Sequence, residues 1–112
     1  MANTFKLKTK AGIDDSLTTI YTVPASTTTV VIGLTIANIK GTSITADAKV
    51  ISDTVDTETN ADVYLVKDIA LADGSSVEVM SGNKIVLQTT DAIQVKGSAT
   101  DSVDAILGIM EI

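Results

Sequence analysis

Residues 21–38 read YTVPASTTTVVIGLTIAN, and this stretch carries the strongest fold signal in the chain. Proline fixes φ and has no N–H to donate, so Pro24 predicts a turn over residues 24–26 between two strands. Beyond the turn, bulky apolar residues recur at every second position, which predicts that they share one face of a long strand. These residues are Val30, Ile32, Leu34 and Ile36. The stretch therefore predicts a central strand of a β-sheet.

The opposite face of this strand carries smaller or more polar side chains, so we expect it to be partly covered. It holds Val31, Gly33, Thr35 and Ala37. We expect residues 44–50 to form the hairpin partner of the central strand. The pattern places Thr45, Asp47 and Lys49 on the outer face of that partner. Its inward face consists of Ile44, Ala46, Ala48 and Val50.

The rest of the chain repeats short apolar segments between turns rich in Gly, Asp, Asn and Ser, at intervals of roughly 8–12 residues. No segment longer than a turn has a helical period. The further expected strands are residues 5–10, 17–23, 63–71, 77–79, 85–87, 93–95 and 103–112. We predict one all-β domain over residues 1–112, an antiparallel two-sheet β-sandwich of jelly-roll or Greek-key type with about nine short strands.

The first expected strand, FKLKTK, alternates apolar residues and Thr9 with three lysines, which predicts an amphipathic strand with one solvent face. Lysines commonly protect an exposed sheet edge, and we expect this role for Lys6, Lys8 and Lys10. A basic docking arm is the functional alternative for the same lysines. Residues 11–16, AGIDDS, predict a turn.

The composition disfavours several classes of function. The 112 residues carry a net charge of −6, from 14 acidic residues and eight lysines, with no arginine, whereas nucleic-acid binding needs a basic surface. Cysteine and histidine are absent, which disfavours disulfides, thiol nucleophiles, Cys/His zinc sites and imidazole bases. The longest apolar-rich run, residues 30–39, is half of the roughly 20 residues that a spanning helix needs, and residues 1–12 lack the apolar core of a secretory signal. We expect no nucleic-acid and no membrane partner.

Residues 52–62, SDTVDTETNAD, are the most polar segment and predict a long surface loop. Its carboxylates are candidate calcium ligands, because Ca²⁺ binds several oxygens from flexible acidic loops. The candidates are Asp53, Asp56, Glu58 and Asp62. Their spacing does not match an EF-hand loop, and a solvated acidic loop without a metal is the simpler interpretation.

The sequence contains no catalytic constellation. No histidine is present to activate a serine or threonine, and no G-x-S-x-G elbow or phosphate-binding glycine motif occurs. Paired carboxylates alone would not make a glycosidase, since sugar clefts generally use aromatic platforms and the chain has one Phe, two Tyr and no Trp. We predict a protein that is not an enzyme and uses no cofactor.

Four segments together resemble a known family: TTIYTVPASTTTVVIGL (18–34), VYLVKDIAL (63–71), GSSVEVMSGNKIVLQTTD (74–91) and SVDAILGIMEI (102–112). They are similar to small virion structural proteins of tailed bacteriophages, especially marine cyanophages. The resemblance implies a structural component made in the host bacterial cytoplasm and assembled with other virion proteins. It would attach to the capsid or tail as a decoration, cement or tail-associated protein.

Apolar residues on both faces of the central and last strands also favour a homo-oligomer, for which phage architecture suggests a trimer. A second hypothesis is a receptor- or glycan-binding head with the 52–62 loop as its tip. That hypothesis predicts a concave polar site.

Overall fold

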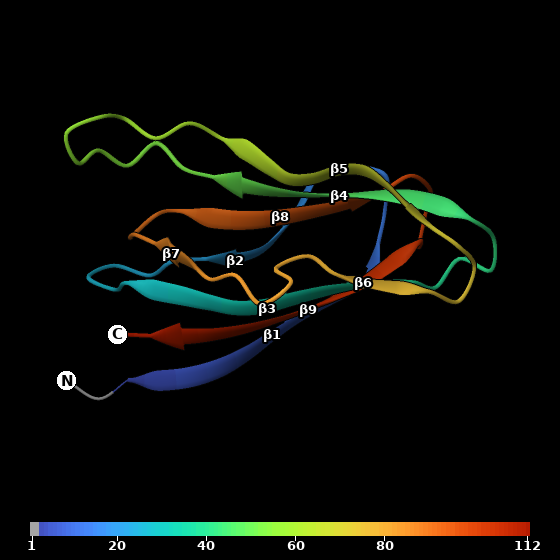
Figure 1. The fold of residues 1–112 in the computed structure, drawn as a ribbon, viewed down its shortest axis with the longest axis horizontal. Helices are drawn as coiled ribbons and strands as arrows, with labels where there is room; N and C mark the ends of the chain where they lie inside the picture. The colour runs from blue at the N-terminus through green and yellow to red at the C-terminus, as the bar shows by residue number, and fades with distance from the viewer. Residues whose placement is uncertain (1–2) are drawn as a thin grey trace.

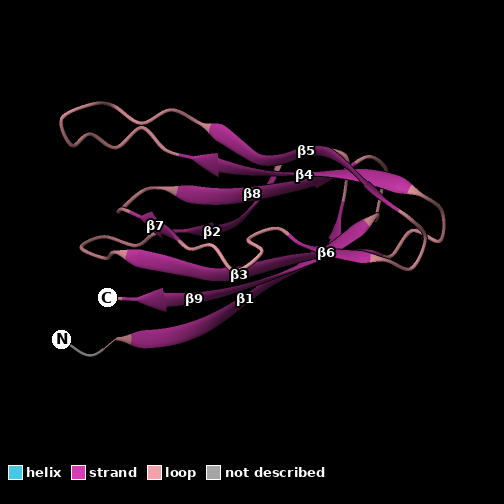
Figure 2. Cartoon of the chain, in the orientation of Figure 1, coloured by secondary structure: helices cyan, strands magenta, loops and turns pink. Residues whose placement is uncertain are grey.

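Short strands separated by polar turns occupy residues 3–112, the part of the chain that the computed structural model describes (Figures 1 and 2). Within this part there are nine strands and no helix, so none that could span a membrane. The strands are β1 (Thr4–Ile13), β2 (Thr18–Thr22), β3 (Thr29–Asn38), β4 (Ile44–Ile51), β5 (Val63–Leu71), β6 (Ser76–Glu78), β7 (Ile85–Leu87), β8 (Ala92–Gly97) and β9 (Val103–Glu111). The predicted turn after Pro24 separates β2 from β3.

The strands form two antiparallel sheets packed face to face. Sheet A has the order β1-β9-β3-β6, with β7 also paired to β3, and sheet B has the order β2-β8-β4-β5. The first strand pairs with the last, β2 with β8, β3 with β6 and β7, and β4 with β5. This nested pairing is a long antiparallel ladder wrapped into two sheets, which is the jelly-roll arrangement. The predicted β-sandwich is confirmed.

The core lies between the two sheets and consists mainly of Val, Ile, Leu and Ala. As predicted, the period of two in β4 separates buried from outward residues, and β9 shows the same alternation. The buried members are Ile44, Ala46, Ala48 and Val50 in β4 and Val103, Ala105, Leu107 and Ile109 in β9. Tyr21 is the buried aromatic residue of the core.

The central strand β3 differs from the prediction, because a β-bulge interrupts its alternation. The pairing with β9 shifts register between Val31 and Gly33, so Ile32 is an extra residue in β3. A single extra residue moves all later side chains to the opposite face. Val31 is therefore buried before the bulge, Leu34 is buried after it, and Ile32 is exposed. The predicted continuous face of residues 30, 32, 34 and 36 was wrong in its first half.

The expected hairpin between β3 and β4 was also wrong. The two strands belong to different sheets, and the loop at residues 39–43 crosses from sheet A to sheet B. Apolar patterns on two successive strands do not specify whether they pair side by side or face each other across a core. In β4, Asp47 lies on the outer face as expected, yet it is only 1% exposed.

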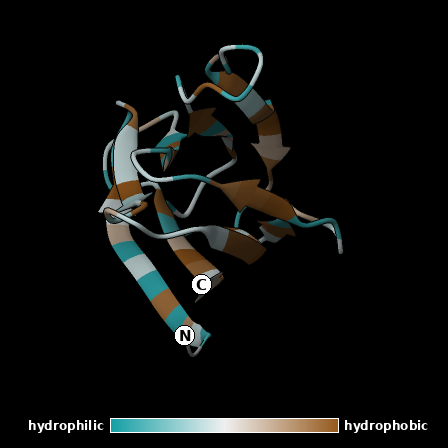
Figure 3. Ribbon diagram, turned by 90° about the vertical axis from the view of Figure 1, so that its left-hand side faces the viewer, coloured by the Kyte–Doolittle hydropathy of each residue, from teal (hydrophilic) through white to brown (hydrophobic). Residues whose placement is uncertain are grey.

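Strand β1 is longer than predicted and lies at an edge of sheet A. It continues through the expected turn to Ile13, with a register shift after Lys10 and a positive φ of 62° at Gly12. Its apolar and charged residues alternate, as the hydropathy colours along the N-terminal strand show (Figure 3). The three lysines pair with buried residues of β9, so they lie on the core-facing side of sheet A. Phe5 and Leu7 lie on the opposite, outer side and are exposed. The apolar face of β1 is thus outside the core.

Candidate interaction surfaces

The 52–62 segment forms the predicted loop, and it extends beyond the sandwich between β4 and β5 (Figure 1). Val55 and Thr59 form an isolated bridge across it. At its base, the Ser52 N–H donates to the Asp62 carboxylate over 2.9 Å. The Asn60 N–H donates to the Thr54 carbonyl over 2.9 Å. The loop is therefore a small ordered hairpin closed at its base.

The calcium candidates do not converge in this hairpin. Asp53, Asp56 and Glu58 are exposed, and Asp62 uses a carboxylate oxygen to hold the loop base. Within residues 3–112, no group of three or more acidic side chains is arranged to hold a metal ion. Because Ca²⁺ needs about six to eight oxygens around one point, the loop as it stands offers no assembled site.

A polar hollow of about 700 Å³ lies between this loop and the segment that follows β7. Its lining combines hydroxyl, amide and carboxylate groups with two valines, and comprises Thr54, Val55, Asp56, Asn60, Val86, Gln88, Thr89 and Asp91. A more apolar hollow of about 370 Å³ shares Asn60, Val86 and Asp91 with it and continues along β5. The two form one groove at the open edge of the sandwich.

Asp91 lines both parts of the groove and is almost completely buried. Its Oδ2 accepts the Gln88 N–H over 2.9 Å, and the Asp91 N–H donates to the Gln88 carbonyl over 3.0 Å. Its Oδ1 is buried without a hydrogen-bond partner. The sequence did not distinguish this residue, because an aspartate after two threonines is an ordinary turn signal.

The outer face of sheet A is the main apolar surface. Residues directly opposite each other in antiparallel strands share a face, so the register defines rows across the sheet. One row crosses β1, β9, β3 and β7 and consists of Phe5, Met110, Val30 and Val86. Phe5 is 72% exposed. A large exposed apolar area on a sheet is typical of an interaction surface.

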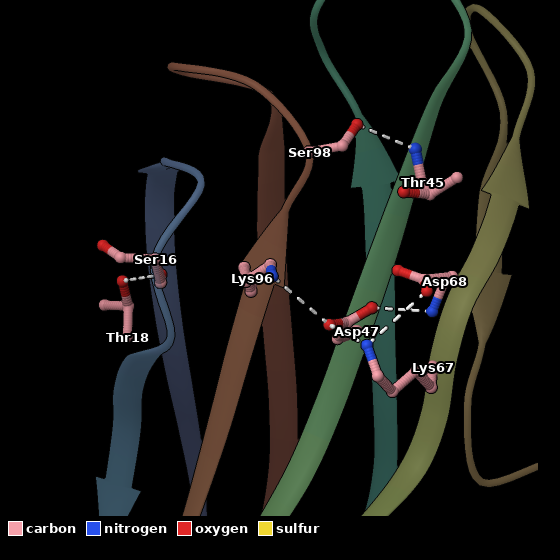
Figure 4. A network of polar contacts seen from close by, with 8 residues as sticks. All are labelled: Ser16, Thr18, Thr45, Asp47, Lys67, Asp68, Lys96 and Ser98. Carbon is pink, nitrogen blue, oxygen red and sulfur yellow. Dashed lines mark hydrogen bonds and ion pairs between the residues drawn. The ribbon is translucent and has the colours of Figure 1, made fainter.

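The outer face of sheet B is polar and is organised around Asp47 (Figure 4). Its Oδ1 accepts the Asp68 N–H over 2.7 Å, where β5 bulges and Asp68 has a φ of 51°. Its Oδ2 lies 3.8 Å from the ammonium groups of both Lys67 and Lys96. Asp47, and secondarily Asp68, raise the pKa of Lys67. The buried carboxylate thus holds three strands together.

A second polar cluster joins the two sheets near the chain termini. The Tyr21 hydroxyl donates to Glu111 over 2.6 Å and lies 2.7 Å from the Thr29 hydroxyl, and Lys6 forms a 2.7 Å ion pair with Glu111. Burial and the hydrogen bond to Glu111 raise the pKa of Tyr21 to about 12. Lys6, and then Tyr21, lower the pKa of Glu111. One of the edge lysines therefore has a structural role.

Glu78 stabilises the bulged part of β3. Its carboxylate accepts hydrogen bonds from the Leu34 N–H, the Thr35 hydroxyl and the Met80 N–H at 2.8–3.1 Å. Burial by itself would raise the pKa of Glu78, but these hydrogen bonds to the ionised form outweigh it and the pKa is lowered. The turn after β6 is thereby tied to the centre of sheet A.

These lowered pKa values predict a stability that falls in acid. In the folded chain, Glu78 and Glu111 remain ionised below pH 4.5. This is their ordinary pKa, at which they are half protonated in the unfolded chain. Their contribution is therefore complete well above pH 4.5 and is lost as the pH falls toward the folded-state pKa values. Urea unfolding between pH 7 and pH 3 should show this loss.

Glu78→Gln should flatten part of that acid slope. Glu58→Gln is the matched control, because it removes the same charge from the exposed loop without touching these hydrogen bonds. Equal slopes for Glu78→Gln and the wild type would contradict the assignment.

Comparisons with known proteins identify the fold. No family model and no curated protein matches the sequence. A chain in the crystal structure of the T13 viral particle of infectious bursal disease virus is similar over 97% of this chain and 30% of its own length, with a TM-score of 0.56 and 8% identity. A chain of the Gx strain of that virus matches over 96% and 32%, with a TM-score of 0.50 and 14% identity. The protein thus has a sandwich fold also found in viral particles, and it spans about a third of the length of those chains.

Proposed function

We propose that this protein is a non-enzymatic structural component of a tailed-phage virion, attached to the capsid or tail as a decoration, cement or tail-associated protein. The observation that carries the proposal is the apolar outer face of sheet A, on a jelly-roll domain whose core is already complete without it. Such a surface is suited to contact with another protein. The resemblance of four sequence segments to small phage virion proteins supports the same role, and so does the fold shared with chains of a viral particle.

The polar groups of the domain fit a structural role. Asp47 accepts a backbone hydrogen bond and contacts two lysines, Glu78 accepts two backbone hydrogen bonds and one from a threonine, and Glu111 joins β1, β2 and β9. Each of these carboxylates joins strands rather than facing a cleft. These polar groups therefore stabilise the domain itself, as expected for a structural protein.

Immunogold labelling of intact particles tests this proposal. An antibody raised against the purified protein should label the particles that carry it at regular positions on the capsid or tail. Mass spectrometry of the same density-purified particles should give a fixed copy number per virion. Recovery of the protein solely from the particle-free fraction of infected cells would contradict the proposal.

A receptor- or glycan-binding head is a second candidate, favoured by the polar groove beside the 52–62 loop. Amide, hydroxyl and carboxylate groups such as Asn60, Gln88 and Asp56 match the hydrogen-bonding groups of a sugar or a polar peptide. Binding of fluorescent glycans to the wild type, with loss of binding in Gln88→Ala, would establish this function. Absence of binding across a broad glycan panel would exclude a glycan-binding function.

A separate experiment tests whether the 52–62 loop of such a binding head binds calcium. Because the loop carboxylates do not converge, we expect EDTA to leave the melting temperature of the wild type unchanged. The double variant Asp56→Ala/Glu58→Ala should melt at nearly the same temperature, with the same lack of response to EDTA. A drop in melting temperature with EDTA that the double variant lacks would show that the loop binds calcium.

A further inference from the structure

The outer face of sheet A is ordered from an apolar end to a polar end. The row of Phe5, Met110, Val30 and Val86 lies near the two chain termini. The third row from this end ends at Glu78, and the fourth contains Asp104. The residues that form the apolar row carry no charge, although the chain as a whole has a net charge of −6. This part of the surface is where a second acidic molecule would meet the least repulsion.

Two paired glycines lie between the first and third rows. Gly33 is directly opposite Gly108, and Leu7 continues their row onto β1. Gly108 does not have a positive φ, and a Cβ built there would have no atom within 4 Å. Neither the backbone nor the packing of this chain therefore requires glycine at residue 108, and glycine in a strand often marks the close approach of another surface.

The size of the face matches a standard protein contact. Strands β1, β3 and β9 have ten, ten and nine residues, and β6 and β7 add a fourth position across the sheet. At about 3.3 Å per residue and about 4.8 Å between strands, the face covers roughly 600 Å² in projection. This projected area is of the same order as the roughly 800 Å² per partner of a typical stable interface.

We propose that two copies of this chain pack through the outer faces of sheet A, about a two-fold axis parallel to the strands. This inference rests on the proposed function, since it names the surface by which the virion component self-associates. Rotation about this axis places each row of the second copy at the same position along the strands. It reverses the order of the strands across the sheet. Phe5 then lies over Val86 of the second copy, and the apolar row of one copy meets the same row of the other.

The apolar rows favour this direction over an axis perpendicular to the strands. With the parallel axis, each apolar row meets the apolar row of the second copy. The perpendicular axis would instead set the apolar row of Phe5, Met110, Val30 and Val86 against the end of the face that carries Glu78 and Asp104. The lysines of β1 lie on the core-facing side of sheet A and take no part in the contact.

Light scattering after gel filtration, combined with sedimentation across a concentration series, tests the surface. We expect the wild type to be a dimer. Phe5→Lys and Gly108→Lys should each weaken dimerisation by about 30-fold or more. Each substitution occurs in both copies and therefore places two charges in the contact. Both positions face open space in the single copy, so both variants should fold.

Ile39→Lys is the control for Phe5→Lys. Ile39 is also exposed, at 47%, but it follows the end of β3 that is far from the apolar row. The Ile39→Lys variant should therefore remain dimeric. A wild type that is monomeric at high micromolar concentration, or that forms a trimer, would overturn the proposal, as would equal effects of Ile39→Lys and Phe5→Lys.

Single cysteines test the direction of the axis, because the chain has none of its own. Mixing Phe5→Cys with Val86→Cys under oxidation should give a disulfide-linked dimer, whereas either variant alone should not. A disulfide formed by Phe5→Cys alone would overturn the parallel axis.

Particle labelling separates this inference from the proposed function. Regular labelling by a protein that is monomeric in solution would refute the dimer and leave the virion role standing. A dimer that never appears on particles would refute the virion role alone.

Discussion

Replacing Gly97 with alanine is expected to lower the free energy of unfolding by about 3 kcal/mol, the upper part of the range for overpacking a core. Gly97 is buried at the end of β8, and a Cβ added there would lie 1.9 Å from the Ser102 Oγ and 3.2 Å from its Cβ. Ser102 is also fully buried, so its side chain has little room to move. A backbone shift would instead disturb the hydrogen bond from the Gly97 N–H to the Asp14 carbonyl.

A double-mutant cycle with Ser102→Ala isolates the steric cause. The Ser102 hydroxyl makes a long 3.4 Å hydrogen bond to the Ile13 carbonyl, so its loss alone should have a small effect. The double variant Gly97→Ala/Ser102→Ala should recover most of the lost stability, because the overlapping oxygen is gone. Urea unfolding of all four proteins provides the comparison. A double variant as unstable as Gly97→Ala would show that the overlap is not the cause.

Replacing Leu107 with alanine is expected to lower the free energy of unfolding by about 2–5 kcal/mol. Leu107 is fully buried in β9, which lies between β1 and β3 in sheet A, so the surrounding strands cannot easily collapse into the cavity. A loss of this size is a large part of the roughly 5–15 kcal/mol that stabilises a typical domain. Thermal unfolding should therefore occur at a clearly lower temperature.

Val63→Ala is the control for Leu107→Ala. Val63 lies in β5 but is more than half exposed, and its truncation should change the unfolding free energy by less than about 1 kcal/mol. Similar losses in both variants would mean that Leu107 does not occupy the centre of the core.

Local chemistry in the sequence determines some features of this fold directly. The alternation in β4 was sufficient to predict its buried face, because a strand buried on one face must place its apolar residues at every second position. The turn at Pro24 was predictable because proline restricts the backbone locally, whereas β1 continues to Ile13 through most of the turn that was expected over residues 11–16. The 52–62 loop was predictable because a polar segment of that length cannot enter the core.

The candidate surfaces were only partly predictable. Apolar residues on both faces of β3 and β9 indicated a covered outer face, but Phe5 in β1 was not recognised as part of it. The groove beside the loop depends on Asp91, Asn60 and Val86, which are separated in the chain and meet only in the folded protein. No local pattern marks such residues, because their common position comes from strand pairing across the sandwich.

The sequence by itself determined that this protein is an all-β domain with short strands, a core of aliphatic side chains and an acidic loop, because these properties follow from local alternation, turn chemistry and composition. The tertiary structure alone decided the bulge at Ile32, the assignment of β3 and β4 to different sheets, and the burial of Asp47 beneath two lysines. It also decided which apolar face remained outside the core. These features depend on register and pairing between distant strands, and a period of two reads the same whether its apolar face meets the core, a second copy or water.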